Sequence, residues 1–403
     1  MSDFTWLDYS EKERQQVMQV IELFREEDTR DELGIGAIRD TIADLLFPGT
    51  STIQTRLRYF LFIPWLMKLI EQKRVPSHKA AKRSRDYQGR LRDVLMAQST
   101  GDGIIGAVAG YKVQRLPSNI YWNGLAAWGI RLFPGSEMSY YQSLDGFYDR
   151  HRTNRVTPDG EPGKEVLLEN WDPALPLPPE NLLDFTKFTV TKEEANYLLD
   201  RIRKQQPDSL LRELMERAEI VPDEIRFPWE HPAVRELPNK LRDHVTHARN
   251  FSELMHGAAL LYNLILAEQR SWDERIQHYQ KQIDLWQNLM RTREFAIVSW
   301  SMEHFWMLIR DAGGRVTPHT KTFVENWYRL VQSSSSTVAH PENQAARNMI
   351  TDRERQIKRN RARINNPRLQ ELWLGTSGAA QLEYRWKVPV KSYLNDMALA
   401  LSK

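Results

Sequence analysis

Residues 47–66 read FPGTSTIQTRLRYFLFIPWL, a short turn followed by a segment with one polar and one bulky apolar side. Ser51 or Thr52 could cap a helix that starts here, and Pro64 should kink or end that helix. The helical spacing of apolar residues in 35–46 predicts another helix just before the turn. The sequence therefore predicts two helices joined by a short turn in this region.

Two helices joined by a short turn are the outline of a helix-turn-helix module, whose second helix enters the major groove of DNA. Gln54, Thr55 and Arg58 fall on the polar side of the second predicted helix. Glutamine can pair with adenine and arginine with guanine, so these three residues are expected to face bases. The stretch GIIGAVAGYKV at 103–113 predicts short strands that could serve as a wing. The alternative is an αα-hairpin whose polar side faces water.

The rest of the chain divides by composition. Residues 156–200 contain six prolines, and ten acidic residues against three lysines. Such a stretch is poor core material, so we expect a linker at 156–190 between a helical domain at 1–155 and a second helical domain at 191–403. Thr191 and Glu194 match a capping box at the start of the second domain. The predicted fold is therefore mainly α, with two domains and an N-terminal helix-turn-helix or winged-helix-like part.

Helical spacing of apolar residues continues over 251–311, and a basic helix is expected over 342–364. Within the first of these regions, Gly257 is expected to let another helix approach closely. No internal repeat of solenoid length is found.

Two segments of the chain are strongly basic. Residues 68–92 hold nine Lys or Arg against two acids, and residues 351–368 hold seven against two. Clusters of this kind are the electrostatic footprint of nucleic-acid binding, although most charged runs are simply solvated helix faces. The acidic stretch could also dock on a basic one and mask it. The residues expected to contact phosphates are Lys79, Lys82, Arg83, Arg85, Arg355, Lys358, Arg359 and Arg363.

Signals for catalysis are few. The chain has no cysteine, which excludes disulfides, thiolate catalysis and cysteine-bound metals. No phosphate-binding glycine loop is present, and His244 and His247 lack an evident third metal ligand. His319 and Lys321 form an H-x-K element, which resembles the phospholipase D and nuclease superfamily, although a second copy is missing. We therefore expect no cofactor and no metal, and hold these two residues as reserve catalytic candidates.

The longest apolar run, 59–70, is shorter than the roughly 20 residues that a bilayer span needs. The N-terminus is polar and acidic and lacks the apolar core of a signal peptide. We expect a cytoplasmic protein without membrane contact.

Several phrases resemble an uncharacterised prokaryotic family that carries a domain-of-unknown-function label. They are DELGIGAIRDTIADLLFPGTSTIQTRLRYFLFIPW, LPSNIYWNGLAAWGI, FSELMHGAALLYNLILAE and YRWKVPVKSYLNDM, at 31–65, 116–130, 251–268 and 384–397. The resemblance implies no known activity. It implies a setting near helicase and phage-defence genes, and so a helicase or another defence protein as a possible partner.

The expected function is nucleic-acid binding, with DNA as the expected form, by a non-catalytic component of an antiviral defence or DNA-processing assembly. One alternative is a phosphodiesterase effector that uses His319 and Lys321. The other is a protein–protein scaffold subunit.

Overall fold

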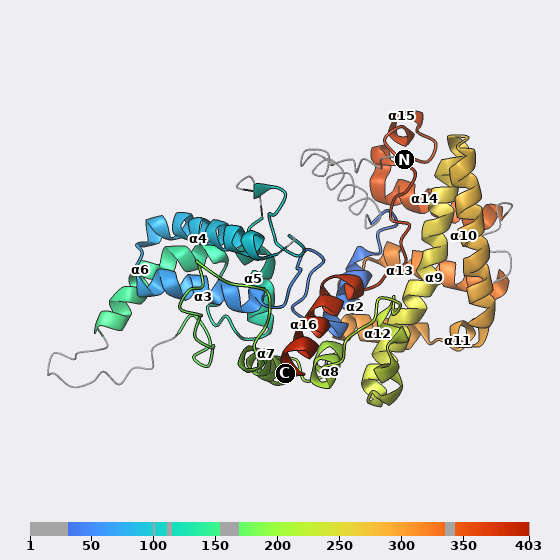
Figure 1. Cartoon of the computed structure of the whole chain (residues 1–403). Helices are drawn as coiled ribbons and strands as arrows, with labels where there is room; N and C mark the ends of the chain where they lie inside the picture. The colour runs from blue at the N-terminus through green and yellow to red at the C-terminus, as the bar shows by residue number, and fades with distance from the viewer. Residues whose placement is uncertain (1–30, 100, 111–114, 154–168, 335–342, 403) are drawn as a thin grey trace, which may run out of the picture. The chain divides into compact units, whose positions relative to one another are not determined.

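The computed structural model describes residues 31–99, 101–110, 115–153, 169–334 and 343–402. These residues are mainly helical, as predicted (Figure 1). They divide into two compact units, each assembled from separate parts of the chain. Unit 1 contains the described residues up to Ile42 together with Asp243–Tyr384, and unit 2 contains Ala43–Arg242 together with Arg385–Lys403. Residues on both sides of the predicted linker lie in unit 2, so the two-domain split at 156–190 is not confirmed.

Unit 1 is built around the long helix α9 (Asn239–Gln269), whose apolar side chains from Phe251 onward are almost completely buried. Gly257 of α9 faces Trp286 of α10, and a Cβ atom at this glycine would lie 2.3 Å from the indole ring. The expected close approach of a second helix at Gly257 is confirmed. The helices that lie wholly in unit 1 are α10 (Asp273–Thr292), α11 (Glu294–Val298), α12 (Met302–Asp311), α13 (Pro318–Ser334), α14 (Gln344–Lys358) and α15 (Pro367–Gln370). The unit boundaries fall within α2 (Gly36–Leu46) and near the start of α9 (Asn239–Gln269).

Unit 2 is built around α3 (Tyr59–Gln72), in which nearly every side chain from Tyr59 to Met67 is buried. Helix α3 packs against α4 (Ser77–Gln98) and α5 (Pro117–Ala127), and α4 also packs against α6 (Glu137–Thr153) (Figure 1). The remaining helices of the unit are α7 (Lys192–Gln205), α8 (Leu210–Arg217) and α16 (Lys391–Leu401). Because α4 packs on two neighbours with one side only, its other side remains available to solvent.

The predicted start of the second helix of this pair at Ser51 or Thr52 is wrong, because α3 begins at Tyr59. Side chains satisfy the backbone groups that a helical turn would have paired. The side-chain oxygen Oε1 of Gln54 accepts a hydrogen bond from the backbone amide of Ser51 at 3.1 Å. The backbone amides of Thr55 and Arg56 donate to the Tyr121 hydroxyl at 2.8 and 3.1 Å. Polar side chains compete with helix formation in this way. Pro64 does not end α3, which continues to Gln72.

The strands predicted in 103–113 are not formed in the part that the structure describes. Residues 101–110 are turns, and the glycines at 101, 103, 106 and 110 all have positive φ, which a strand does not allow. Residues 111–113 lie outside the described residues. Elsewhere in the described chain there is an isolated bridge between Arg131 and Trp171 and no strand. The winged-helix interpretation is therefore not confirmed.

Two further predictions have different outcomes. The capping box at the start of α7 is confirmed: the Thr191 hydroxyl accepts the Glu194 amide at 3.2 Å, and the Glu194 carboxylate accepts the Thr191 amide at 3.0 Å. The basic helix expected over 342–364 ends earlier, because α14 stops at Lys358 and Arg359 has a φ of 51°. A helix cannot continue through a residue in that conformation.

The part of the predicted linker at 169–190 has no helix, but it is an integral part of unit 2. Asn170 and Trp171 both donate to the Glu71 carboxylate of α3, at 2.9 and 3.1 Å. The Trp65 indole donates to the carbonyl of Pro176 at 2.7 Å. Residues 156–168 lie outside the described residues. In the described helices, none is both long and apolar enough to cross a membrane.

Candidate nucleic-acid interface

Helix α4 is held in place by its buried side. Its sequence is rich in alanine, lysine, arginine and leucine, which favour helix formation. At its start, the Ser77 amide donates to Asp145 of α6 at 3.0 Å, and the Asp145 amide donates to the Ser77 hydroxyl at 2.9 Å. Further along, the buried Gln88 side chain bonds to both the amide and the hydroxyl of Ser118 in α5 at 2.9 Å. These contacts fix which side of α4 faces away from the core.

The outward side of α4 carries a set of basic residues that were predicted as phosphate contacts. All are exposed, and none forms an ion pair with another described residue. From the first to the last they span about 9 Å of helix, at about 1.5 Å per residue. We call them the basic face of α4: Lys79, Lys82, Arg83 and Arg85. Free cations at this spacing can contact several phosphates of a polyanion that lies along the helix.

The described part of the acidic stretch contacts this helix at Arg90, past its midpoint. Asp184 pairs with Arg90, and Arg90 also donates to the carbonyl of Leu183 at 2.8 Å. Both Arg90 and Asp184 are more than half exposed at the side chain. The expected docking of the acidic stretch on a basic segment therefore occurs at Arg90, while the basic face of α4 has no such cover from the described residues.

Two further cations of the first basic segment lie close to this helix and are not among the predicted phosphate contacts. Lys73 and Arg74 follow α3 directly and are both exposed. The Lys73 ammonium lies 5.5 Å from the ring centroid of Tyr87, and the Arg83 guanidinium lies 5.7 Å from it. The high charge density of residues 68–92 is the sequence signal that indicates Lys73 as a contact. The sequence does not show that Lys73 and Arg83 lie near the same aromatic ring.

The residues expected to read bases lie elsewhere and have internal partners. Gln54 is 1% exposed and Arg58 is 6% exposed. The Arg58 guanidinium pairs with Glu194 at 2.6 Å and donates to the carbonyl of Lys187 at 2.6 Å. The Thr55 hydroxyl donates to the carbonyl of Gly103 at 2.7 Å. This geometry leaves these side chains little donor or acceptor capacity for a base edge, and we do not include them in the interface.

The basic residues of the second segment do not lie on one continuous helix as expected, since α14 ends at Lys358, before Arg359 and Arg363. Arg355 is exposed and lies 3.6 Å from Asp352, and Arg359 is exposed at the turn that follows the helix. Lys358 and Arg363 instead point toward a buried carboxylate, Glu32, which both of them pair with. The structure therefore brings together the residues of the first basic segment and separates those of the second.

The carboxylate of Glu32 is the centre of this second cluster. It also accepts a hydrogen bond from Ser377, and Lys358 further contacts Glu354 at 2.8 Å. Burial alone raises the pKa of Glu32, but Lys358, Ser377 and Arg363 more than offset this and hold the pKa below its usual value. Lys358 and Arg363 thus stabilise a buried charge within unit 1, which explains their positions without a ligand.

His319 and Lys321 lie in the first turn of α13, and both are exposed. Positions two apart on an α-helix point about 200° apart, at about 100° per residue. In a strand the same spacing would place both side chains on one face. Lys321 lies 5.6 Å from the Trp306 ring and 3.9 Å from Glu325. The two side chains therefore do not converge on a common reacting group.

His247, one of the two histidines considered as metal ligands, has a packing role on α9. The Trp300 indole donates to Nδ1 of His247 at 2.7 Å, which requires that this nitrogen is unprotonated. Burial lowers the pKa of His247 to about 4. In the part of the chain that the structure describes, no group of three or more His, Asp or Glu side chains is placed to hold a metal ion.

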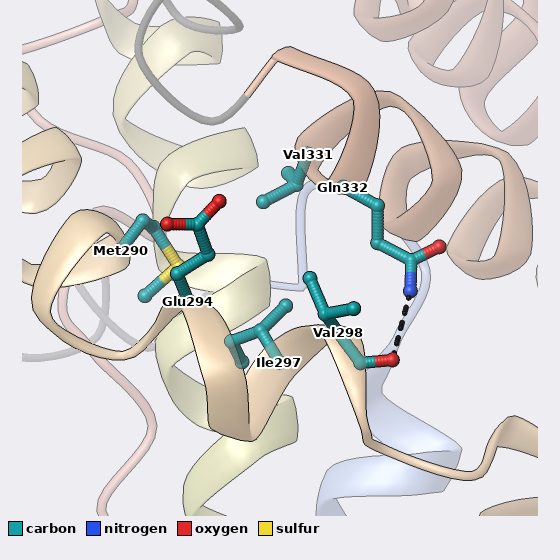
Figure 2. Close-up of a pocket in the computed structure, with 6 residues that line it drawn as sticks. All are labelled: Met290, Glu294, Ile297, Val298, Val331 and Gln332. Atoms are coloured by element: carbon teal, nitrogen blue, oxygen red, sulfur yellow. Dashed lines mark hydrogen bonds between the residues drawn. The ribbon is translucent and has the colours of Figure 1, made fainter.

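A shallow apolar pocket lies in unit 1 between α10, α11 and α13. Figure 2 shows Ile297 and Val298 of α11 facing Met290 and Val331, with Glu294 at the rim. The Gln332 amide donates to the carbonyl of Val298 at 3.3 Å. Phe295, in the same short helix, is 86% exposed. Val298, three residues further along this helix, is 53% exposed, so the two residues form a small contiguous apolar surface. Contiguous exposed apolar surfaces mark protein–protein contacts.

Comparison with known proteins identifies a family and no activity. A model described as a family of unknown function (DUF6361) matches residues 1–400. Searches of curated proteins and of solved structures found no match. The chain therefore belongs to the family of unknown function DUF6361, which confirms the family resemblance inferred from its sequence.

Proposed function

We propose that this protein binds nucleic acid, with DNA as the expected form, through the basic face of α4. It would act as a non-catalytic component of a bacterial antiviral defence or DNA-processing assembly, with a helicase or another defence protein as a partner. The observation that carries the proposal is the set of exposed, unpaired cations Lys79, Lys82, Arg83 and Arg85 on one helix.

Electrostatics support this choice over a merely solvated helix. Duplex DNA carries one charge per about 1.7 Å of its axis, and each phosphate neutralised by a cation releases bound counterions. A cation that already pairs with a carboxylate releases fewer counterions, because its charge is offset. Arg90 is such a case, since it pairs with Asp184, whereas the basic face of α4 has no acidic partner among the described residues.

The same surface favours contact with the sugar–phosphate backbone over base readout. Base-specific contacts need side chains that reach into a groove with fixed geometry. The polar side chains expected to do so, Gln54 and Arg58, are buried in internal hydrogen bonds. We therefore propose binding with little sequence preference.

The test is a fluorescence anisotropy titration of the full chain with single- and double-stranded DNA and RNA at low salt. A variant with Lys79, Lys82, Arg83 and Arg85 all changed to Gln should bind at least tenfold more weakly, which is about 1.4 kcal/mol. The matched control changes an equal number of exposed cations in unit 1 that form no ion pair with a described residue: Lys281, Arg291, Arg315 and Arg368. Equal losses in both variants would mean that net charge alone, and not the basic face of α4, accounts for binding.

A protein–protein scaffold is the second candidate, and the exposed Phe295 beside the apolar pocket favours it. Absence of nucleic-acid affinity at low salt, in a chain that is folded, would leave the scaffold as the better proposal. Magnesium or manganese added to the same mixtures tests the phosphodiesterase alternative. Cleavage that is lost in a folded His319→Ala variant would favour that alternative.

A further inference from the structure

The Tyr87 hydroxyl lies in the core-facing part of α4 and has no hydrogen-bond partner among the described residues. The side chain as a whole is 8% exposed. A buried hydroxyl without a partner lowers stability, and nearly all such groups in native proteins are satisfied. An unsatisfied hydroxyl therefore points to a partner outside the described residues.

Two cations flank the ring of this tyrosine. Lys73, directly after α3, and Arg83, one turn earlier in α4, both lie within 5.7 Å of the ring centroid. Both residues are exposed, and neither forms an ion pair within the described chain. Asp86, an acid in the same helix, forms no ion pair with either of them there. Two like charges beside one ring repel each other, and an anion bound between them removes that repulsion.

We infer that Lys73, Arg83 and the Tyr87 hydroxyl form a binding site for a phosphate group. An ammonium, a guanidinium and a phenol together offer many donors, which suits a ligand that is all acceptor. The ligand is a phosphodiester of the nucleic-acid backbone, and this part of the inference rests on the proposed function. Lys73 and Arg83 are long exposed side chains, and the site requires that rotation of one of them gives the ligand access to the hydroxyl.

The site has a consequence that separates it from a structural tyrosine. Because the hydroxyl makes no bond within the described chain, Tyr87→Phe should leave the melting temperature unchanged or raise it. The same substitution removes a donor to a charged oxygen, so affinity for a short single-stranded oligonucleotide should fall about tenfold. A structural hydroxyl would give the opposite pattern, with lower stability and unchanged affinity.

Tyr148 provides a matched control. It lies on α6 beside the turn between α3 and α4, and its hydroxyl donates to the carbonyl of Val75 at 3.1 Å. Tyr148→Phe removes a satisfied hydroxyl, so it should lower the melting temperature and leave affinity unchanged. Lys73→Gln should weaken oligonucleotide binding and reduce the slope of log affinity against log salt by about one.

Direct observation uses the full chain labelled with 3-fluorotyrosine and followed by fluorine NMR. The resonance that disappears in Tyr87→Phe belongs to Tyr87. It should shift when inorganic phosphate is added, and also when the oligonucleotide is added. No shift with either ligand, or unchanged affinity of Tyr87→Phe, would overturn the site.

The outcomes separate this inference from the proposed function. If the chain binds nucleic acid but the Tyr87 resonance does not respond, the proposed function stands and the phosphate site is wrong. If the resonance responds to inorganic phosphate but the chain binds no nucleic acid at low salt, the site is a phosphate site and the proposed function is wrong. Response to both ligands, with weaker binding by Tyr87→Phe, supports both.

Discussion

Arg58 and Glu194 form an ion pair at 2.6 Å in which each side chain is 7% exposed. Glu194 also caps α7, and Arg58 also lies 5.3 Å from the Phe62 ring. A residue whose spacing suggested a base contact thus joins the turn before α3 to the start of α7. The pair connects parts of unit 2 that are far apart in the sequence.

Replacing Arg58 with Met should lower the free energy of unfolding by about 3–5 kcal/mol, because it leaves the Glu194 carboxylate buried without its partner. Chemical denaturation at neutral pH measures this loss. Adding Glu194→Gln to the same chain should recover much of it, since glutamine keeps the cap without a charge. A folded Arg58→Met chain with a stability loss below about 1 kcal/mol and a clear loss of DNA affinity would instead restore the base-reading role.

The sequence predicted helices where apolar spacing is long and regular, and it predicted the capping box at Thr191 because that motif is local. It did not predict the burial of Gln54 and Arg58, because their partners are distant in the chain. Arg56 pairs with Asp396 at 2.5 Å, and Gln54 accepts from Tyr393 at 3.0 Å. Helical spacing assigns polar residues to solvent by default, and only tertiary contacts reverse that assignment.

Contacts with distant residues also explain why only one of the two basic segments forms an exposed cationic surface. Their charge counts are similar, but Lys358 and Arg363 meet the distant carboxylate of Glu32, while the basic face of α4 has no acid opposite it among the described residues. Charge density in a sequence does not show which cations have internal partners. The end of α14 also could not be predicted from the sequence. Arg359 has a left-handed backbone conformation there, and no glycine signals that conformation in the sequence.

Gly257→Ala should lower the free energy of unfolding by about 1–3 kcal/mol, as overpacking of a core does. The new Cβ would lie 2.3 Å from the Trp286 ring, which is fixed by a hydrogen bond to the carbonyl of Glu253 at 2.7 Å. Gly146→Ala is the control: this glycine is exposed in α6, and alanine there should raise stability by about 0.5–1 kcal/mol. Equal effects of the two substitutions in thermal denaturation would contradict close packing at Gly257.

Acid should destabilise the protein partly through His247. The folded-state pKa is about 4, below the ordinary value of 6.5, so the unfolded chain takes up the proton first as the pH falls. The stabilisation of the folded state by neutral His247 is complete above pH 6.5 and is lost as the pH falls to about 4. Since His247 is only partly buried, we expect the free energy of unfolding to fall by about 1–2 kcal/mol over this range.

His247→Gln isolates this effect, because its amide oxygen can accept from Trp300 without titrating. Urea unfolding between pH 7 and pH 4 should show a weaker pH dependence for this variant than for the parent chain, in which the charges of Asp243, His244 and His304 also act on His247. Identical pH dependence in both proteins would remove His247 as the cause.

Asp184→Asn should strengthen nucleic-acid binding, because it releases Arg90 from its acidic partner and adds a free cation next to the basic face of α4. The pair is exposed, so stability should change by no more than about 1 kcal/mol. We expect affinity to rise a few-fold, and the slope of log affinity against log salt to steepen by about one, as for one added phosphate contact. Asp208→Asn is the matched control, since it frees Lys240 from an equally exposed pair away from α4. If both variants bind equally well, the gain reflects net charge, and the acidic stretch does not mask the interface.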